Sequence, residues 1–349
     1  MTDKTVIGKK ISPVVIVFLG LLAAIAPLST DMYLPALPSM TDNFNVSSSM
    51  VQLTLTGSLV GMAVGQLFAG PLSDIFGRKP PLIASMLIFS LATAGCFLSD
   101  SIYPFLCFRL LQGFFGGAGI VIARAVVRDI ASGPELMKLF SMLMLVNGLA
   151  PVAAPVIGGQ ILRFFSWRGV FALLFIIAVG LTVGSLIFKE TLKTTGKGGL
   201  KKSLIMYRIL MRDTYFMGHC IMQCFAFAAF FAYIAGSSFL FQNVYHLSAQ
   251  TYSYLFGING IGLWLTGLLV SRLAGHAKDW KILRCALILA FAGSIVLFLG
   301  LFFQVSVVFI AVVLFVTVST LSAMGASSFS LAMGAHGKAA GGAAALIGF

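Results

Sequence analysis

Residues 51–80 read VQLTLTGSLVGMAVGQLFAGPLSDIFGRKP, in which an apolar block, residues 51–70, is followed by a short charged segment. An α-helix rises about 1.5 Å per residue, so about 20 apolar residues cross the hydrocarbon core of a bilayer. Blocks of this kind recur along the chain, and the alternation expected of membrane-spanning strands is absent from the sequence. The sequence therefore predicts an all-α, polytopic membrane protein.

The composition of the whole chain excludes a soluble globular protein. Of its 349 residues, 59% are hydrophobic and 9% are charged, and the mean hydropathy is +1.02. A soluble domain has about a quarter of its residues charged. The five cysteines form no CxxC pattern, so we expect neither disulfides nor a metal site. The sequence also shows no nucleophile–base constellation and no phosphate-binding loop, so we expect no enzymatic activity and no cofactor.

The apolar blocks predict ten full spans and the beginning of an eleventh at residues 341–349. The ten spans are residues 14–37, 51–70, 81–98, 103–127, 136–164, 170–188, 215–241, 252–273, 282–303 and 305–333. The segment 189–214 is the longest connection and is rich in lysine and glycine. It divides the chain into an N-terminal six-helix half, residues 1–188, and an incomplete C-terminal half, residues 215–349.

The basic residues orient these spans. If the N-terminus is cytoplasmic, all 23 basic residues except Arg109, Arg163 and Arg168 fall on the cytoplasmic side. Cytoplasmic loops carry an excess of lysine and arginine, so this asymmetry predicts a cytoplasmic N-terminus. The net charge of +13 then faces anionic lipid of the inner leaflet, and we expect no nucleic-acid partner.

Glycine spacing predicts where helices pack closely. Gly57, Gly61 and Gly65 repeat every fourth residue and form one stripe, and Gly113 and Gly117 form a second pair. In lipid, small residues allow helix backbones to approach each other. Such stripes are common in membrane helices and are compatible with a transporter without being specific to one.

The span at residues 136–164 carries Pro151 and Pro155, followed by Gly158 and Gly159. A proline inside a helix removes a backbone donor and bends or loosens the helix. Two prolines and a glycine pair in one span predict a shaped, functional helix.

Four stretches together resemble the major facilitator superfamily. They are STDMYLPALP (29–38), GPLSDIFGRKP (70–80), RLLQGFFGGAG (109–119) and NGLAPVAAPVIGGQIL (147–162). The first, with ARAVVRDI (123–130) and SSFLFQNVYHLS (237–248), is similar to drug:proton antiporters of the bicyclomycin/chloramphenicol-resistance (Bcr/CflA) type. The resemblance implies a gating or conformational role for Gly70, Asp74, Gly77, Arg78, Lys79, Gln112, Gly113, Pro151, Pro155, Gly158 and Gly159.

The fold implied by the resemblance has twelve helices in two pseudo-symmetric halves, with the transport site between them. This sequence stops shortly after its tenth span, so we expect a truncated second half. In relatives, the acid that matches Asp74 contacts the helix-eleven region, which is incomplete here. Ala154 also stands where many members have glycine.

Asp31 is the only acid inside any predicted span, and Arg109 is the only base placed clearly within the membrane. Each lies about six residues, or about 9 Å, from the outer end of its span. A charge near the bilayer centre costs about 2.5–3.5 kcal/mol on insertion scales, so such residues pair with each other or line water. We therefore expect the two to take part in proton coupling. The alternatives are a solvated acid at a helix end for Asp31 and a structural clamp for Arg109, bonded to backbone carbonyls or to Gln112.

Other polar residues are candidates for contact with a substrate. They are Tyr33, Asn147, Tyr233, Gln242 and Asn259, and each could equally be a hydrogen bond between helices. His219 titrates near neutral pH in water but is expected to pack near the interface. The 32 phenylalanines and 15 methionines could supply an adaptable apolar pocket.

The resemblance implies proton-coupled efflux of small lipophilic drugs across the bacterial inner membrane. The expected partners are drug molecules, protons and membrane lipid, and we expect a monomer that draws energy from the proton gradient. Two alternatives stay open: a symporter for a metabolite or sugar, which would favour a more polar cavity, and a non-transporting membrane fragment.

Overall fold

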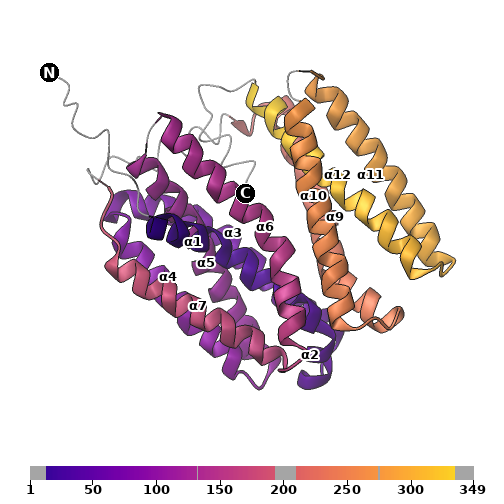
Figure 1. The fold of residues 1–349 in the computed structure, drawn as a ribbon, viewed down its shortest axis with the longest axis horizontal. Helices are drawn as coiled ribbons and strands as arrows, with labels where there is room; N and C mark the ends of the chain where they lie inside the picture. The colour runs from indigo at the N-terminus through magenta and orange to yellow at the C-terminus, as the bar shows by residue number, and fades with distance from the viewer. Residues whose placement is uncertain (1–12, 132, 193–209, 274–275, 335–349) are drawn as a thin grey trace.

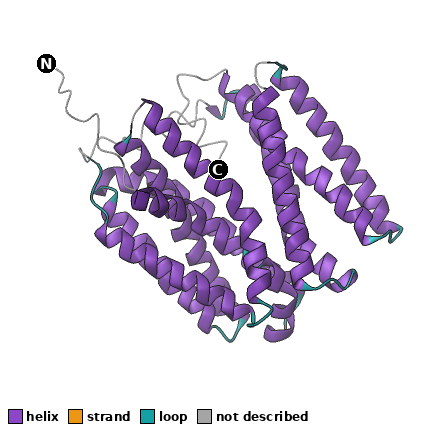
Figure 2. Ribbon diagram, viewed as in Figure 1, coloured by secondary structure: helices purple, strands orange, loops and turns teal. Residues whose placement is uncertain are grey.

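The computed structural model describes residues 13–131, 133–192, 210–273 and 276–334, and in these ranges helices joined by short loops make up nearly all of the chain (Figures 1 and 2). The long helices are α1 (Pro13–Asp31), α3 (Ser48–Phe76), α4 (Lys79–Leu98), α5 (Ile102–Ile130), α6 (Gly133–Ile161), α7 (Trp167–Ile187), α9 (Thr214–Phe239), α10 (Ala249–Leu273), α11 (Asp279–Phe302) and α12 (Val307–Gly334). Three short elements are the 3₁₀ turn η1 (Leu34–Ala36), α2 (Leu37–Phe44) and the π-helical turn η2 (Leu240–Val244).

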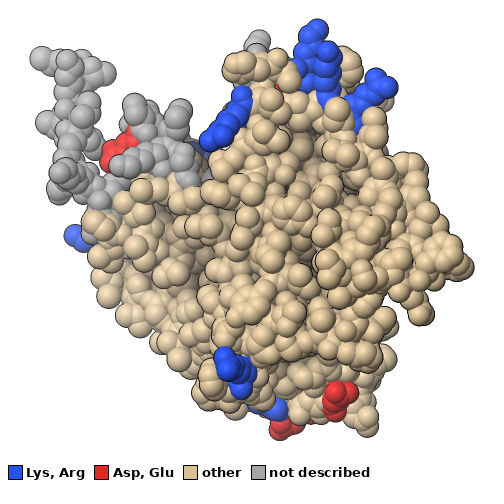
Figure 3. Space-filling model, turned by 45° about the vertical axis from the view of Figure 1, so that its right-hand side comes forward, with Lys and Arg blue, Asp and Glu red and all other residues tan. Residues whose placement is uncertain are grey.

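The long helices confirm the prediction of a polytopic helical membrane protein. Nine of the helices in the described residues are long and apolar enough to cross a membrane, and α6 contains a shorter apolar stretch, Gly148–Ile161. Charged side chains gather at the two ends of the face in Figure 3, and the broad band between them is uncharged. Each of the ten predicted spans corresponds to a long helix; the predicted start of an eleventh, residues 341–349, lies outside the described residues.

The first predicted span, residues 14–37, lies within one candidate membrane span, Pro13–Phe44, but it is not a single unbroken helix. Helix α1 ends at Asp31, and a turn leads into η1 and α2. The physical reason is the proline spacing, because Pro35 and Pro38 lack the N–H groups that would continue the helical ladder. The short elements η1 and α2 mark one end of the bundle, which we name the α2 end. The opposite end, where Gly77 and Arg78 join α3 to α4, is named the Arg78 end.

Helices α3 and α5 are in close contact, as the glycine spacing predicts. A Cβ atom on Gly61 or Gly65 would overlap the carbonyls of Leu110 and Phe114. A Cβ on Gly113 of α5 would likewise overlap the Ser58 carbonyl of α3. The two backbones approach each other where both surfaces lack side chains.

The described helices form two groups, seen in Figure 1 as α1 and α3–α7 beside α9–α12. Helices α6 and α10 lie against each other along the boundary. At the α2 end both groups contribute to one apolar core, which contains Leu37, Phe171, Ile234 and Phe256. A second core, around Leu22, Phe89 and Ile122, belongs to the first group alone. The α2 end is therefore where the two groups share apolar packing.

Candidate functional site

Asp31 is the last residue of α1 and lies inside the protein, with 8% of its surface exposed. The two hydroxyl residues before it fold back on the helix. Ser29 Oγ donates to the Ala26 carbonyl at 2.8 Å, and Thr30 Oγ1 donates to the Pro27 carbonyl at 3.0 Å. The acid therefore occupies the point at which α1 stops, next to backbone that is no longer helical.

Arg109 of α5 is completely buried and is bound to the segment that carries Asp31. Its Nη1 donates to the Ser29 carbonyl at 2.9 Å and to Gln112 Oε1 at 2.5 Å. Gln112 in turn donates from Nε2 to Thr93 Oγ1 at 2.8 Å. The guanidinium carbon lies 4.4 Å from the centre of the Tyr33 ring. The position of Arg109 is thus fixed by a carbonyl, an amide and an aromatic face.

The relationship between Asp31 and Arg109 is electrostatic and longer in range than a salt bridge. Among the described residues, the ion pairs at contact distance are Arg78–Asp74, Arg78–Asp129 and Arg168–Asp100. Asp31 interacts electrostatically with Arg109 and with Tyr233 and Tyr252 of the second group. Two nitrogens of Arg109, Nε and Nη2, are buried and have no hydrogen-bond partner in the described part of the chain.

The predicted substrate contacts are divided between the two groups. Tyr33 is fully buried, and its hydroxyl lies 3.1 Å from Thr54 Oγ1 beneath Arg109. Tyr233 accepts a hydrogen bond from Asn259 Nδ2 at 2.7 Å and stacks on Phe256. Gln242 is bonded across the boundary between the groups, to the Pro35 carbonyl at 3.0 Å. The side chain of Asn147 lies outside the described residues.

Arg78 organises the opposite end of the bundle. It is 1% exposed and donates to Asp74 Oδ1 at 2.6 Å, to Asp129 Oδ2 at 2.7 Å and to Ser73 Oγ at 2.8 Å. Burial lowers the pKa of Arg78, but the two carboxylates outweigh it and hold the pKa above its ordinary value. Asp74 and Arg78 therefore belong to one cluster that joins α3, α4 and α5. The helix-eleven region predicted to contact Asp74 lies outside the described residues.

Gly158 and Gly159 allow α6 to pack closely against the segment that follows α1 and against α10 of the second group. A Cβ on Gly158 would overlap the Met32 carbonyl, and a Cβ on Gly159 would overlap Ser253 of α10. Gln250 of α10 also donates to the Gly159 carbonyl at 3.1 Å. Helix α6 is continuous through Pro151 and Pro155. Gly70, by contrast, meets Val121 at an ordinary distance of 3.7 Å for an added Cβ.

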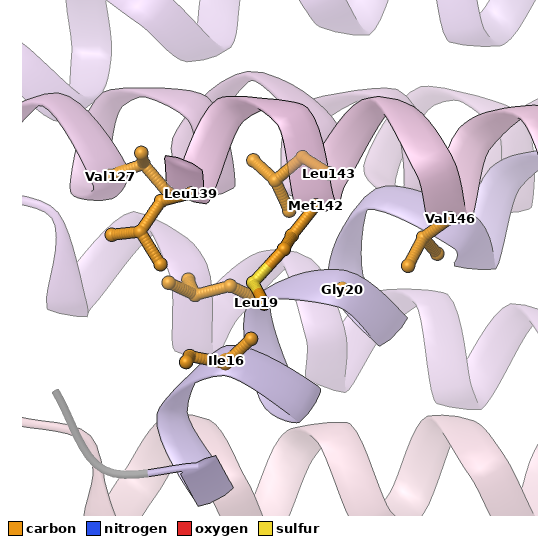
Figure 4. Close-up of a pocket in the computed structure, with 8 residues that line it drawn as sticks. All are labelled: Ile16, Leu19, Gly20, Val127, Leu139, Met142, Leu143 and Val146. Carbon is orange, nitrogen blue, oxygen red and sulfur yellow. The ribbon is translucent and has the colours of Figure 1, made fainter. Parts of the chain in front are cut away.

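A pocket between α1, α5 and α6 is lined entirely by apolar residues (Figure 4). Its lining residues are Ile16, Leu19, Gly20, Val127, Leu139, Met142, Leu143 and Val146. Neither Asp31 nor Arg109 lines this pocket. Its walls can therefore contact apolar groups but supply no polar side chain for recognition. Among the described residues, no three His, Cys, Asp or Glu side chains are grouped to hold a metal ion.

Comparison with known proteins decides the family. A model of the Major Facilitator Superfamily matches residues 19–349. The chain belongs to this superfamily. Transporters of the Major Facilitator Superfamily are not enzymes and need no cofactor, which agrees with the expectations from the sequence.

Relatives within the superfamily confirm the predicted resemblance to the bicyclomycin/chloramphenicol-resistance type. The chain is 38% identical over 335 residues to the uncharacterised MFS-type transporter YdgK of Bacillus subtilis, covering 95% of this chain and 83% of the relative. It is 34% identical over 289 residues to a bicyclomycin resistance protein homolog of Haemophilus influenzae, covering 81% and 72%. It is 28% identical over 277 residues to multidrug resistance protein D of Escherichia coli, covering 78% and 70%.

Solved structures confirm the superfamily fold. A bacterial homolog of the human lysosomal transporter Spinster, in an inward-facing conformation, aligns with a TM-score of 0.75 at 16% identity, covering 97% of this chain and 79% of that one. A D-xylose–proton symporter aligns with a TM-score of 0.71 at 15% identity, covering 96% and 88%. At this level of identity the likeness concerns the fold alone.

Glu190, which follows α7, is a structural residue that the sequence alone did not reveal. Its carboxylate accepts four backbone N–H groups, from Arg78, Lys79, Thr191 and Leu192, each at 2.9 Å. Burial raises the pKa of Glu190, but these four bonds outweigh it and hold the pKa below its usual range. Helix α4 has no side-chain cap of its own at Arg78, so Glu190 supplies acceptors for N–H groups at this terminus.

Gly77 makes room for this contact. Its φ of +89° is a conformation that favours glycine, and a Cβ at this position would meet Glu190 Oε2 at 2.6 Å. The segment that follows α7, the last helix of the first group, is thereby hydrogen-bonded to the start of α4 at the Arg78 end. The greater part of the connection that follows, residues 193–209, lies outside the described residues.

Proposed function

We propose that this Major Facilitator Superfamily transporter exports small lipophilic drugs in exchange for protons. The observation that carries the proposal is the position of Asp31, a buried acid at the broken end of α1. It lies within electrostatic reach of Arg109 in its own group and of Tyr233 in the other. Relatives named for bicyclomycin resistance and multidrug resistance support the choice of cargo.

In this proposal the Asp31 carboxyl binds a proton or gives it up when drug arrives. A charged carboxylate inside the membrane is costly without a partner. The Asp31 carboxyl is therefore neutral while it holds a proton, and it becomes a carboxylate when cargo or a cation takes the place of the proton. Arg109 is held by Ser29 and Gln112, and therefore supplies a fixed positive potential. Each proton that enters contributes about 2.3 kcal/mol per 100 mV of membrane potential.

The proposed orientation places the Arg78 end in the cytoplasm and the α2 end outside. It follows from the excess of lysine and arginine at the loops of the Arg78 end. The two groups of helices then act as the two halves, residues 1–188 and 215–349, joined by the linker 189–214. The transporter would work as a monomer in the bacterial inner membrane.

Accumulation of labelled chloramphenicol in bacterial cells tests the function. Cells that express the protein should accumulate several-fold less drug than cells with an empty vector, and a protonophore should abolish the difference. Asp31→Asn should raise accumulation to the level of the empty vector, because the amide cannot exchange a proton. Asp42→Asn is the matched control, since Asp42 is an exposed acid in the neighbouring α2. Unchanged, protonophore-sensitive export by Asp31→Asn would remove Asp31 from the mechanism.

A further inference from the structure

The prolines that end α1 leave backbone carbonyls able to accept further hydrogen bonds. In a continuous helix the Leu34 carbonyl would accept from the N–H of residue 38, but Pro38 has none. The Leu34 carbonyl instead accepts from the Leu37 N–H in 3₁₀ geometry. A carbonyl oxygen has two lone pairs, so one remains for another donor.

Two side chains of the second group use this segment. Ser238 Oγ donates to the Leu34 carbonyl at 2.7 Å, and Gln242 Nε2 donates to the Pro35 carbonyl at 3.0 Å. Gln242 Nε2 also lies 2.8 Å from Ser238 Oγ, so the two donors support each other. Ser238 is fully buried, and these bonds join residues more than 200 positions apart in the sequence.

Other contacts close the same end of the boundary. Gln52 of α3 donates to the Ala235 carbonyl at 3.2 Å, and Gln160 of α6 donates to Tyr254 Oη at 2.7 Å. Gln250 of α10 also donates to the Gly159 carbonyl of α6 at 3.1 Å. The hydrogen bonds from Ser238 and Gln242 are thus part of a seal at the α2 end, and they hold the segment that follows Asp31.

We infer that Ser238 and Gln242 form a latch that keeps the α2 end closed, with the Leu34 and Pro35 carbonyls as its catch. The inference rests on the proposed transport function, in which cargo leaves at the α2 end and the latch must open. The latch uses neutral donors and backbone acceptors, so it opens without separating charges. A neutral hydrogen bond has a modest net strength, which suits a contact that forms and breaks in every cycle.

Thiol labelling of the full chain tests the latch. The five native cysteines are replaced by alanine, and Ser253→Cys supplies one thiol, buried in the boundary against Gly159. A membrane-impermeant maleimide is applied to right-side-out and to inside-out vesicles, so the result does not depend on an assumed orientation. We expect slow labelling with the latch intact. Ser238→Ala or Gln242→Ala should each raise the rate from the α2 side about fivefold, the change expected from loss of one hydrogen bond across the boundary between the groups.

Two further variants sharpen this test. Pro38→Ala restores an N–H that competes with Ser238 for the Leu34 carbonyl, so it should also raise the rate. Ser294→Ala is the matched control, because the Ser294 hydroxyl bonds to Ala290 within its own exposed helix. A single symmetrical peak in detergent gel filtration shows that each variant is folded.

The labelling rate separates failure of the latch from failure of the proposed function, because labelling needs no transport. Unchanged labelling in the Ser238→Ala/Gln242→Ala double variant would overturn the latch, even if drug export is normal. Faster labelling in a protein that exports no drug would support the latch and contradict the proposed function.

Discussion

Arg109 of α5 donates a hydrogen bond to the carbonyl of Ser29, two residues before the acid Asp31. Arg109, the cation that interacts electrostatically with Asp31, is therefore hydrogen-bonded to the backbone of the helix that carries Asp31. This arrangement fixes the distance between the two charges through α1 itself. A change at Arg109 should then act on both the stability of the bundle and the environment of Asp31.

Arg109→Lys should destabilise the protein and impair export. A lysine cannot reproduce the planar contact with Tyr33 and the paired bonds to Ser29 and Gln112. The loss of a hydrogen bond from a charged group lowers the free energy of unfolding by about 1.5–3 kcal/mol. Thermal unfolding in detergent measures this change, with Arg163→Lys at an exposed site as the control. Equal stability of the variant and the parent would show that the bonds to Ser29 and Gln112 carry little energy.

Glu190→Gln should remove part of the acid sensitivity of the protein. Because the folded pKa of Glu190 lies below its usual range, its contribution to stability is present above the unfolded pKa and is lost as the pH falls through the folded pKa. The parent should therefore be more stable than the variant at pH 7, and the two should converge in acid. Melting temperatures between pH 7 and pH 3 test this expectation. Glu135→Gln, at an exposed position on α6, should follow the parent at every pH.

Gly113→Ala should separate α3 from α5, because the added Cβ would overlap the Ser58 carbonyl. Overpacking of this kind costs about 1–3 kcal/mol. Gly180→Ala provides the opposite case, since a Cβ at Gly180 meets nothing within 4 Å. Alanine favours a helix over glycine by up to about 1 kcal/mol, so Gly180→Ala should not lower the melting temperature. A similar loss in both variants would contradict the close packing of α3 and α5.

Asp129→Asn should destabilise the Arg78 cluster more than Asp74→Asn does. The Asp129 side chain is 13% exposed and that of Asp74 is 38% exposed, so solvent screens the second pair more strongly. Each variant leaves Arg78 buried beside one remaining carboxylate. Unfolding in a series of mild denaturant concentrations compares the stability of the two variants. A larger loss of stability in Asp74→Asn would contradict the expectation that Asp129 is the stronger partner of Arg78.

Much of the candidate site could be approached from the sequence because the signals are local. The depth of Asp31 and Arg109 follows from counting residues along two apolar blocks, and the close contact at Gly61 and Gly113 follows from spacing along single helices. The bond between Arg109 and Gln112 joins residues three apart on one helix, and it was foreseen as one of two alternatives. The functional roles of Asp31 and Arg109 stay predictions.

Contacts between segments that are far apart in the sequence could not be predicted from the sequence. Glu190 binds the N-terminus of α4 across more than 100 residues, and Ser238 reaches Leu34 across more than 200. Such partners are backbone groups, a carbonyl on every residue and an N–H on every residue except proline, so no residue type in the sequence marks them. The exact end of α1 at Asp31 also came from the structure, although both prolines that cause it are visible in the sequence.

The sequence by itself determined the membrane-spanning helical architecture, because the bilayer demands long apolar blocks whose backbone groups are satisfied within each segment. It also singled out Asp31 and Arg109, which the structure buries. The tertiary structure alone decided what those side chains meet, since a buried polar group must find a partner wherever the packed helices place one. Arg109 therefore lies against the Ser29 carbonyl instead of in contact with Asp31, and the α2 end is closed by Ser238 and Gln242.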